Sequence, residues 1–279
     1  MKTETMTCGA ARGILVAALL GLSAGAHAAA AERMSRYNVV WTNASADASG
    51  VMPFGNGDIA AGVYAIENGD LFLLLAKNDA YTYMGDIFKT GRVRIALSPN
   101  PFAAGKAFRQ TLDLATGSVV MEADGVALRI WADASRPVYH VEISAPDEIA
   151  VTARPEFWKR FDRCSFNRGD YASCRGEPPQ DVLLDRKDKI IWYYSVGDRS
   201  IYRDDLADYG VEHMASRFPD PFRFNTFGNL LEMEADGRVQ DAAGGVLAGK
   251  GKRFDIRIHA LTLQTPEPSR WVERIERQA

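Results

Sequence analysis

Two short segments carry the amide and acidic side chains that are best placed to do chemistry in this chain. Asn56 and Asp58 lie within Pro53-Phe-Gly-Asn-Gly-Asp58, and Asn78 and Asp79 follow an apolar run. The glycines on either side of Asn56 permit a turn that other residues disfavour. Asn and Asp side chains can satisfy backbone donors within such a turn. These four residues are therefore candidates either for contacting a ligand or for holding a structural loop.

A pair of carboxylate side chains about 5–10 Å apart can hydrolyse a glycosidic bond, so such pairs are the chemistry to consider for hydrolysis. The chain offers five candidates, Asp58, Asp79, Asp86, Asp133 and Glu142. Their spacing singles out none of them, because strands distant in sequence become neighbours in a sheet. No His-Glu-x-x-His zinc motif is present. We therefore assign no catalytic residue, no metal ligand and no cofactor.

The N-terminus has the pattern of a signal peptide. A positively charged start precedes the uncharged apolar run Gly13–Leu22, and Ala26-His-Ala28 is a small-x-small cleavage site. The apolar run is about 10 residues long, whereas a bilayer-spanning helix needs about 20. A retained membrane anchor is the less favoured alternative. We expect residues 1–28 to be removed and the protein to be exported, to the periplasm or outside the cell.

Of the 3 cysteines, Cys164 and Cys174 remain after this cleavage, and both lie in one polar loop. Two cysteines this close in sequence usually pair in an oxidising compartment. A metal site is the alternative, but His140, His213 and His259 all lie far from the loop in sequence. The sequence therefore favours a disulfide over a metal.

The composition and net charge argue against nucleic acid and anionic membranes as partners. The chain is 47% hydrophobic and 25% charged, which is ordinary for a globular protein, and its formal net charge is -3. A slightly acidic protein has no electrostatic attraction to nucleic acid or to an anionic membrane surface. We expect neither partner.

Period-two alternation is the dominant structural signal. Residues Arg92–Leu97 and Arg253–His259 alternate apolar and polar side chains, which is typical of antiparallel strands with one buried face. Leu71–Leu75 and Ile190–Tyr194 are continuous apolar runs that suit strands covered on both sides. The sequence predicts a mostly β fold, a large antiparallel β-sandwich made of two packed sheets.

Turn and helix signals divide the chain further. Asp124-Gly125 and Asp236-Gly237 each lie between apolar runs and predict tight hairpins. Apolar residues at helical spacing predict a short helix near 201–214. The β domain then covers residues 29–264, and Pro-containing residues 265–279 predict a C-terminal helix, which either packs on the sandwich or leads to a further domain.

Several segments together resemble a known family. The fairly specific pair is Met52-Pro-Phe-Gly-Asn-Gly-Asp58 with Gly91-Arg-Val-Arg-Ile-Ala-Leu-Ser-Pro-Asn-Pro-Phe102. The similarity continues at Tyr37–Trp41, Gly69–Ala80, Gln110–Leu114, Ile130–Pro137 and Asn225–Gly228. These segments are similar to the N-terminal domain of proteins related to glycoside hydrolase family 95, the α-L-fucosidases. More closely, they resemble the domain-of-unknown-function family 5703.

This resemblance implies a β-supersandwich that is followed by a helical (α/α)₆ barrel, and the catalytic groups of family 95 lie in that barrel. No position of this chain matches them, so no catalytic residue is carried over. In the related hydrolases the loop that corresponds to Asn56 lies toward the barrel and its sugar site. The resemblance therefore implies that Asn56, Asp58, Asn78 and Asp79 belong either to a structural loop at the domain interface or to a loop that contacts the ligand.

We therefore expect a non-catalytic N-terminal module of a secreted glycoside hydrolase-like protein, with residues 265–279 as a linker helix toward a catalytic barrel that this chain lacks. A free-standing secreted carbohydrate-binding protein is the alternative. A self-sufficient hydrolase that uses carboxylates of the sandwich is the third possibility. The partners expected are a carbohydrate or the barrel itself.

Overall fold

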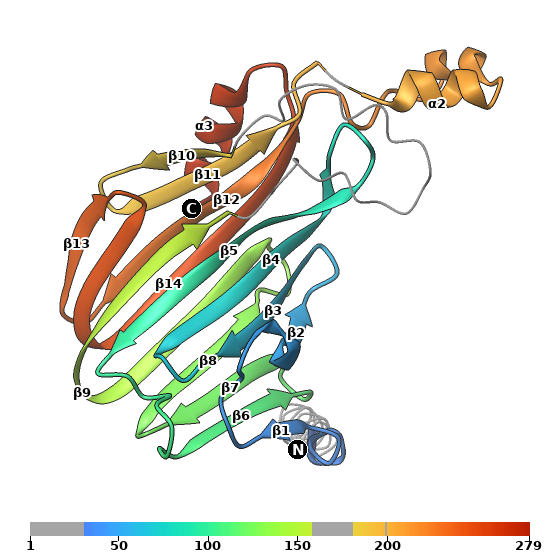
Figure 1. Cartoon of the computed structure of the whole chain (residues 1–279). Coiled ribbons are helices and arrows are strands. Elements are labelled where there is room, and N and C mark those ends of the chain that lie inside the picture. The colour runs from blue at the N-terminus through green and yellow to red at the C-terminus, as the bar shows by residue number, and fades with distance from the viewer. Residues whose placement is uncertain (1–30, 158–180, 199) are drawn as a thin grey trace, which may run out of the picture.

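A computed structural model describes residues 31–157, 181–198 and 200–279, and the body of the molecule is a strongly curled antiparallel sheet (Figure 1). Within these residues 14 strands belong to one hydrogen-bonded sheet, so the prediction of a mostly β fold is confirmed. The predicted signal peptide (1–28) and the Cys164–Cys174 pair lie outside the described residues.

The first strands of the chain are short or of medium length. They are β1 (Val39–Trp41), β2 (Met52–Gly55), β3 (Ile59–Ala65), β4 (Asp70–Tyr81), β5 (Ile87–Ser98), β6 (Phe108–Asp113), β7 (Ser118–Ala123) and β8 (Val126–Ala132). The later strands are β9 (Val138–Glu156), β10 (Val182–Asp185), β11 (Lys189–Ser195), β12 (Asn225–Ala235), β13 (Arg238–Ala243) and β14 (Val246–Gln264). The helical segments are η1 (Ala48–Gly50), α2 (Tyr202–Asp208), η2 (Glu212–Ser216) and α3 (Pro268–Gln278).

Two long strands organise the sheet. β9 and β14 have 19 residues each and pair antiparallel along most of their length. The first part of β9 also pairs with β8, which leads on to β7, β6 and β1. Its last part pairs with β5, which leads on to β4, β3 and β2. The two predicted sheets are therefore two layers of one sheet, joined because β9 and β14 run through both.

The core lies between these two layers. Val93, Ile95 and Leu97 of β5 are at most 4% exposed, and they belong to the same apolar cluster as Ile256 and Ile258 of β14. Burying each such side chain stabilises the fold by about 1.5–3 kcal/mol. The alternation predicted for these strands is confirmed, because their apolar faces meet across the sandwich.

One of the two predicted hairpins, at Asp124-Gly125, is present, since β7 and β8 pair antiparallel. Asp124 and Gly125 join β7 to β8 with φ values of 49° and 83°. Positive φ at both central positions matches the right-handed twist of the flanking strands. Asp236 and Gly237 also connect two strands, β12 and β13, but these strands do not pair with each other, because each pairs with β14 instead. The hairpin predicted at this position is therefore wrong, although the chain does turn there.

The C-terminal helix α3 packs on the outer face of the sheet, over β12 and β14 (Figure 1). Pro268 occupies its first turn, where the missing N–H is not needed. The indole Nε1 of Trp271 donates to the carbonyl of Leu261 at 3.1 Å. The other apolar residues of this contact are Val272 and Ile275 of α3 with Ile191 and Leu230 of the sheet. Of the two expectations for this segment, packing on the sandwich is therefore observed.

The helix predicted near 201–214 is divided into α2 and η2. Gly210 has a φ of 67° and separates them, because a left-handed residue ends a helix. Neither helix has a buried residue, and α2 projects beyond the sheet (Figure 1). In the described part of the chain, no helix has the length and apolar character needed to cross a bilayer.

Candidate functional site

The structure brings the four predicted residues together at one end of the β3–β4 hairpin. Ile59 and Lys77 pair in the ladder, so the 56–58 turn lies beside the end of β4. The backbone N–H of Asn78 donates to the carbonyl of Asp58 at 3.0 Å. The Asn78 side chain donates to the carbonyl of Gly57 at 3.2 Å. The two segments quoted from the sequence thus form one cluster.

Asn56 holds the turn and ties it to the β8–β9 connection. Its Oδ1 accepts hydrogen bonds from the backbone N–H groups of Asp58 and Ile59, each at 2.9 Å. Its Nδ2 donates to the carbonyls of Asp133 at 2.7 Å and Arg136 at 3.1 Å. With both ends of its amide engaged by backbone, Asn56 acts as a structural residue of the loop.

Lys77 is the residue of this site that the sequence reasoning missed. Its Nζ lies 2.7 Å from Asp58 Oδ1 and 2.9 Å from Asp79 Oδ1. The Lys77 side chain is 7% exposed, whereas those of Asp58 and Asp79 are 42% and 48% exposed. The available signal was alternation, because this lysine continues the buried row Leu71, Leu73 and Leu75.

This arrangement does not provide an acid and base pair. Asp58 and Asp79 both accept a hydrogen bond from the same Lys77 ammonium group, so each carboxylate is already engaged by a cation. Asp133 accepts from the backbone N–H of Ser135 and from Arg136, and these hydrogen bonds lower the pKa of its carboxyl. A general acid in a glycosidase needs a raised pKa instead.

The remaining candidate carboxylates lie apart from this cluster. Asp86 lies in the β4–β5 connection and Glu142 is exposed on β9, so neither joins the cluster. Within the three described ranges, no group of three His, Cys, Asp or Glu side chains could hold a metal ion.

A shallow hollow of about 390 Å³ adjoins the cluster. Its walls are mainly apolar, from Phe54, Ala60, Ala76 and Ile87. Asp58, Lys77 and Asn78 also line it. The hollow is thus an apolar surface with exposed acceptors beside it.

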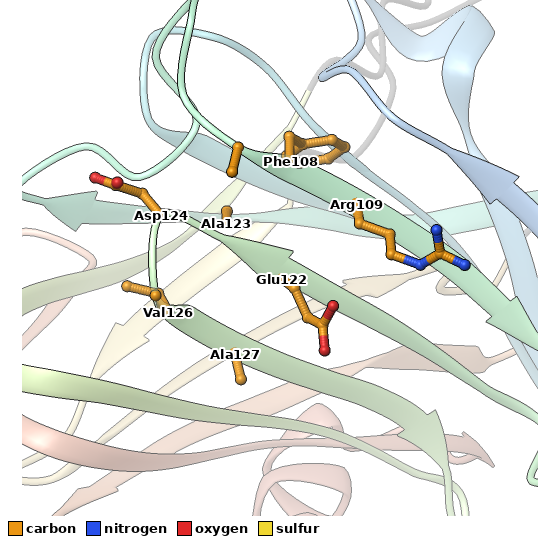
Figure 2. Close-up of a pocket in the computed structure, with 9 residues that line it drawn as sticks. Phe108, Arg109, Glu122, Ala123, Asp124, Val126 and Ala127 are labelled. Carbon is orange, nitrogen blue, oxygen red and sulfur yellow. The ribbon is translucent and has the colours of Figure 1, made fainter.

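A second hollow, of about 350 Å³, lies where β7 ends and β6 and β8 begin (Figure 2). Arg109 and Glu122 face each other across the β6–β7 ladder and their side chains lie on the same side (Figure 2). Phe108 lines it but packs against the core. This hollow gathers none of the predicted site residues.

Trp192 and Trp131 are both engaged in contacts within the domain. Trp192 is fully buried, and its Nε1 donates to the carbonyl of Thr90 at 2.7 Å. The Trp131 ring stacks on His140 with centroids 4.7 Å apart, and Arg129 lies 4.6 Å above it. Burial lowers the pKa of His140, which favours the neutral form of this ring.

A buried ionic cluster lies on the same face of the sheet as α3. Glu232 is 8% exposed and His259 is 5% exposed. Glu232 Oε1 is 3.0 Å from His259 Nε2 and 2.8 Å from Arg257 Nε. Burial by itself raises the pKa of Glu232, but the His259 hydrogen bond and the nearby charges of Arg257 and Lys189 outweigh it and lower the pKa to about 2.

The depressed pKa of Glu232 predicts an acid-dependent loss of stability. A carboxyl with a lowered folded-state pKa stabilises the fold above its ordinary pKa of 4.5, and this contribution is lost as the pH falls toward about 2. We expect the free energy of unfolding to fall between these values by up to about 3 kcal/mol more in the wild type than in Glu232→Gln. Urea titrations at several pH values measure this, and parallel pH profiles for the two proteins would contradict it.

Lys77 gives a second stability prediction. Lys77→Met keeps the length of the side chain but leaves Asp58 and Asp79 facing each other without a cation. We expect a loss of about 1–3 kcal/mol in the free energy of unfolding, measured by urea titration. Lys89→Met is the matched control, because Lys89 is an exposed lysine on the neighbouring strand. Equal effects of the two substitutions would show that the Lys77 contacts contribute nothing.

Fold and site together define a two-layer antiparallel β domain whose polar cluster is held by internal contacts. The family model DUF5703_N, which describes a domain of unknown function (DUF5703), matches residues 40–279 of this chain. The chain therefore belongs to this family, and the closer of the two resemblances seen in the sequence is confirmed. A comparison with curated proteins finds no match.

Proposed function

We propose that this chain is the non-catalytic β-sandwich module of a secreted glycoside hydrolase-like protein and supports a helical-barrel catalytic domain. The observation that carries the proposal is the Lys77 bridge. It occupies Asp58 and Asp79, the two carboxylates that the fold brings together, so the cluster stabilises a loop and offers no free acid and base pair.

The position of α3 supports the same proposal. Its apolar side is buried on the sheet and its other side carries exposed charged residues. A helix fixed in this way can hold a following domain at a defined orientation. The relation to glycoside hydrolase family 95, the (α/α)₆ barrel, the export to the periplasm or beyond and the Cys164–Cys174 disulfide all belong to this proposal.

Two measurements test it. The purified chain, from residue 29 onward, should not turn over an aryl α-L-fucoside or other simple aryl glycosides, and measured turnover that survives repurification would overturn the non-catalytic role. The reading frame downstream of codon 279 should encode a helical barrel. A frame that encodes no such domain, with no barrel protein encoded beside it, would overturn the supporting role.

A free-standing carbohydrate-binding protein is the second candidate. The hollow beside Asp58 and Asn78 favours it, because an apolar wall next to exposed hydrogen-bond acceptors suits the C–H face and hydroxyl groups of a sugar. Calorimetry with mono- and oligosaccharides tests it. Binding that Asp58→Ala weakens and Glu122→Ala, at the second hollow, leaves unchanged would favour this candidate over the first.

A further inference from the structure

Asn225 supports the end of β4 that carries the candidate site. It is the first residue of β12 and is 3% exposed. Its side-chain amide donates to the carbonyl of Asp79 at 3.2 Å and to the carbonyl of Tyr81 at 3.1 Å. The β4–β5 ladder is irregular at this point, since its register shifts between Ala76 and Tyr81. The side chain of Asn225 therefore supplies hydrogen bonds where the regular ladder is interrupted.

The segment that leads into α3 binds the residues just before Asn225. The side chain of Gln264 donates to the carbonyls of Asp220 at 2.7 Å and Arg223 at 2.8 Å. The backbone N–H of Thr265 donates to the carbonyl of Phe224 at 2.9 Å. The start of β12 is thus held on one side by β4 and on the other by the connection to α3.

Phe224, between these two sets of contacts, has a strained backbone. Its φ is 60°, a conformation that a bulky residue adopts only at a cost. Its N–H donates to the carbonyl of Gly197 at 2.7 Å. Strain of this kind persists only while the surrounding contacts impose it. Loss of the Gln264 and Thr265 contacts would let Phe224 relax and would shift the adjoining Asn225.

We propose that Asn225 is a positioning residue that couples the seating of the α3 connection to the Asp79 end of the candidate site. The path runs from Gln264 and Thr265 through Phe224 to Asn225, and from there to the strand end that holds Lys77 and Asp79. The coupling follows from these contacts alone. This coupling would let an attached catalytic domain set the shape of the Asn56 loop, and that role rests on the proposed function.

Hydrogen exchange measured by mass spectrometry on the chain from residue 29 onward tests the coupling. Gln264→Ala removes two surface hydrogen bonds without opening the core. We expect peptides covering residues 76–83 to exchange about tenfold faster in this variant and in Asn225→Ala. In the double variant the rate over 76–83 should match that of Asn225→Ala, because the path is already broken. Gln240→Ala, an exposed glutamine of β13, is the control and should change nothing there.

Two results would overturn the proposal. One is faster exchange in Gln264→Ala that is confined to residues 220–224 and 264–266. The other is an effect over 76–83 that adds fully in the double variant. If Asn225→Ala does not fold, the comparison of Gln264→Ala with the wild type is sufficient. Unchanged exchange over residues 76–83 in Gln264→Ala would overturn the proposed coupling. These outcomes are independent of whether the chain supports a catalytic domain, which the glycosidase assay and the downstream reading frame address.

Discussion

Replacing Trp271 with alanine should lower the free energy of unfolding by about 3–5 kcal/mol. The Trp271 side chain is fully buried between α3 and the outer face of the sheet. Its Nε1 also donates to the carbonyl of Leu261 at 3.1 Å. The substitution therefore opens a cavity and leaves a buried carbonyl without its donor. Denaturation in guanidinium chloride, followed by circular dichroism, measures the loss.

Two further variants separate these contributions. Trp271→Phe keeps most of the apolar area and loses the hydrogen bond, so a cost of about 1–3 kcal/mol is expected. Arg270→Ala, at an exposed neighbouring position of the same helix, should stay within about 0.5 kcal/mol of the wild type. A Trp271→Ala variant as stable as Arg270→Ala would show that α3 is not docked in solution.

The second large effect is expected at Gly91, where alanine should cost about 3 kcal/mol or more. Gly91 has a φ of 125°, a backbone conformation that residues with a side chain rarely adopt. A Cβ placed there would lie 2.9 Å from Nε1 of Trp192. That indole nitrogen is fully buried and donates to the carbonyl of Thr90. Backbone strain and crowding of a fixed ring therefore act together.

Gly117→Ala is the matched control for this prediction. Gly117 has a φ of 64° and no atom within 4 Å of the position a Cβ would take. The free energy of unfolding of Gly117→Ala should therefore fall only by the cost of the left-handed backbone, about 1–2 kcal/mol. Thermal and urea unfolding of both variants give the difference. If Gly91→Ala costs no more than Gly117→Ala, the packing around Trp192 is looser than the structure has it.

The strands and the Asp124-Gly125 hairpin could be predicted because each depends on short-range patterns, whereas the partner of the strand after Asp236-Gly237 is a distant strand, β14. Residues 92–97 alternate because one face meets the core and the other meets water, and the structure buries Val93, Ile95 and Leu97 accordingly. The Asp124-Gly125 turn follows from the positive φ values that a tight hairpin requires. The apolar stripe of α3 follows from helical periodicity in the same way.

What could not be predicted depends on contacts between distant segments. Alternation places His259 on the wetter face of its strand, yet it is 5% exposed because Glu232 and Arg257 pack beside it. Alternation places Lys77 in a buried row, but its partner Asp58 comes from the 56–58 turn, which only the folded chain places beside it. Asn225 is 146 residues from Asp79 in sequence, and only the assembled sheet shows that they touch.

The position of β14 in the sheet has a consequence for how the chain folds during synthesis. β14 is the last strand of this chain, yet it lies inside the sheet between β9 and β12. Until it leaves the ribosome, both neighbours present open edges, and open edges invite pairing with other chains. Assembly of the sandwich must then await β14, so a nascent chain that has reached only β12 or β13 is the species most in need of a chaperone during synthesis.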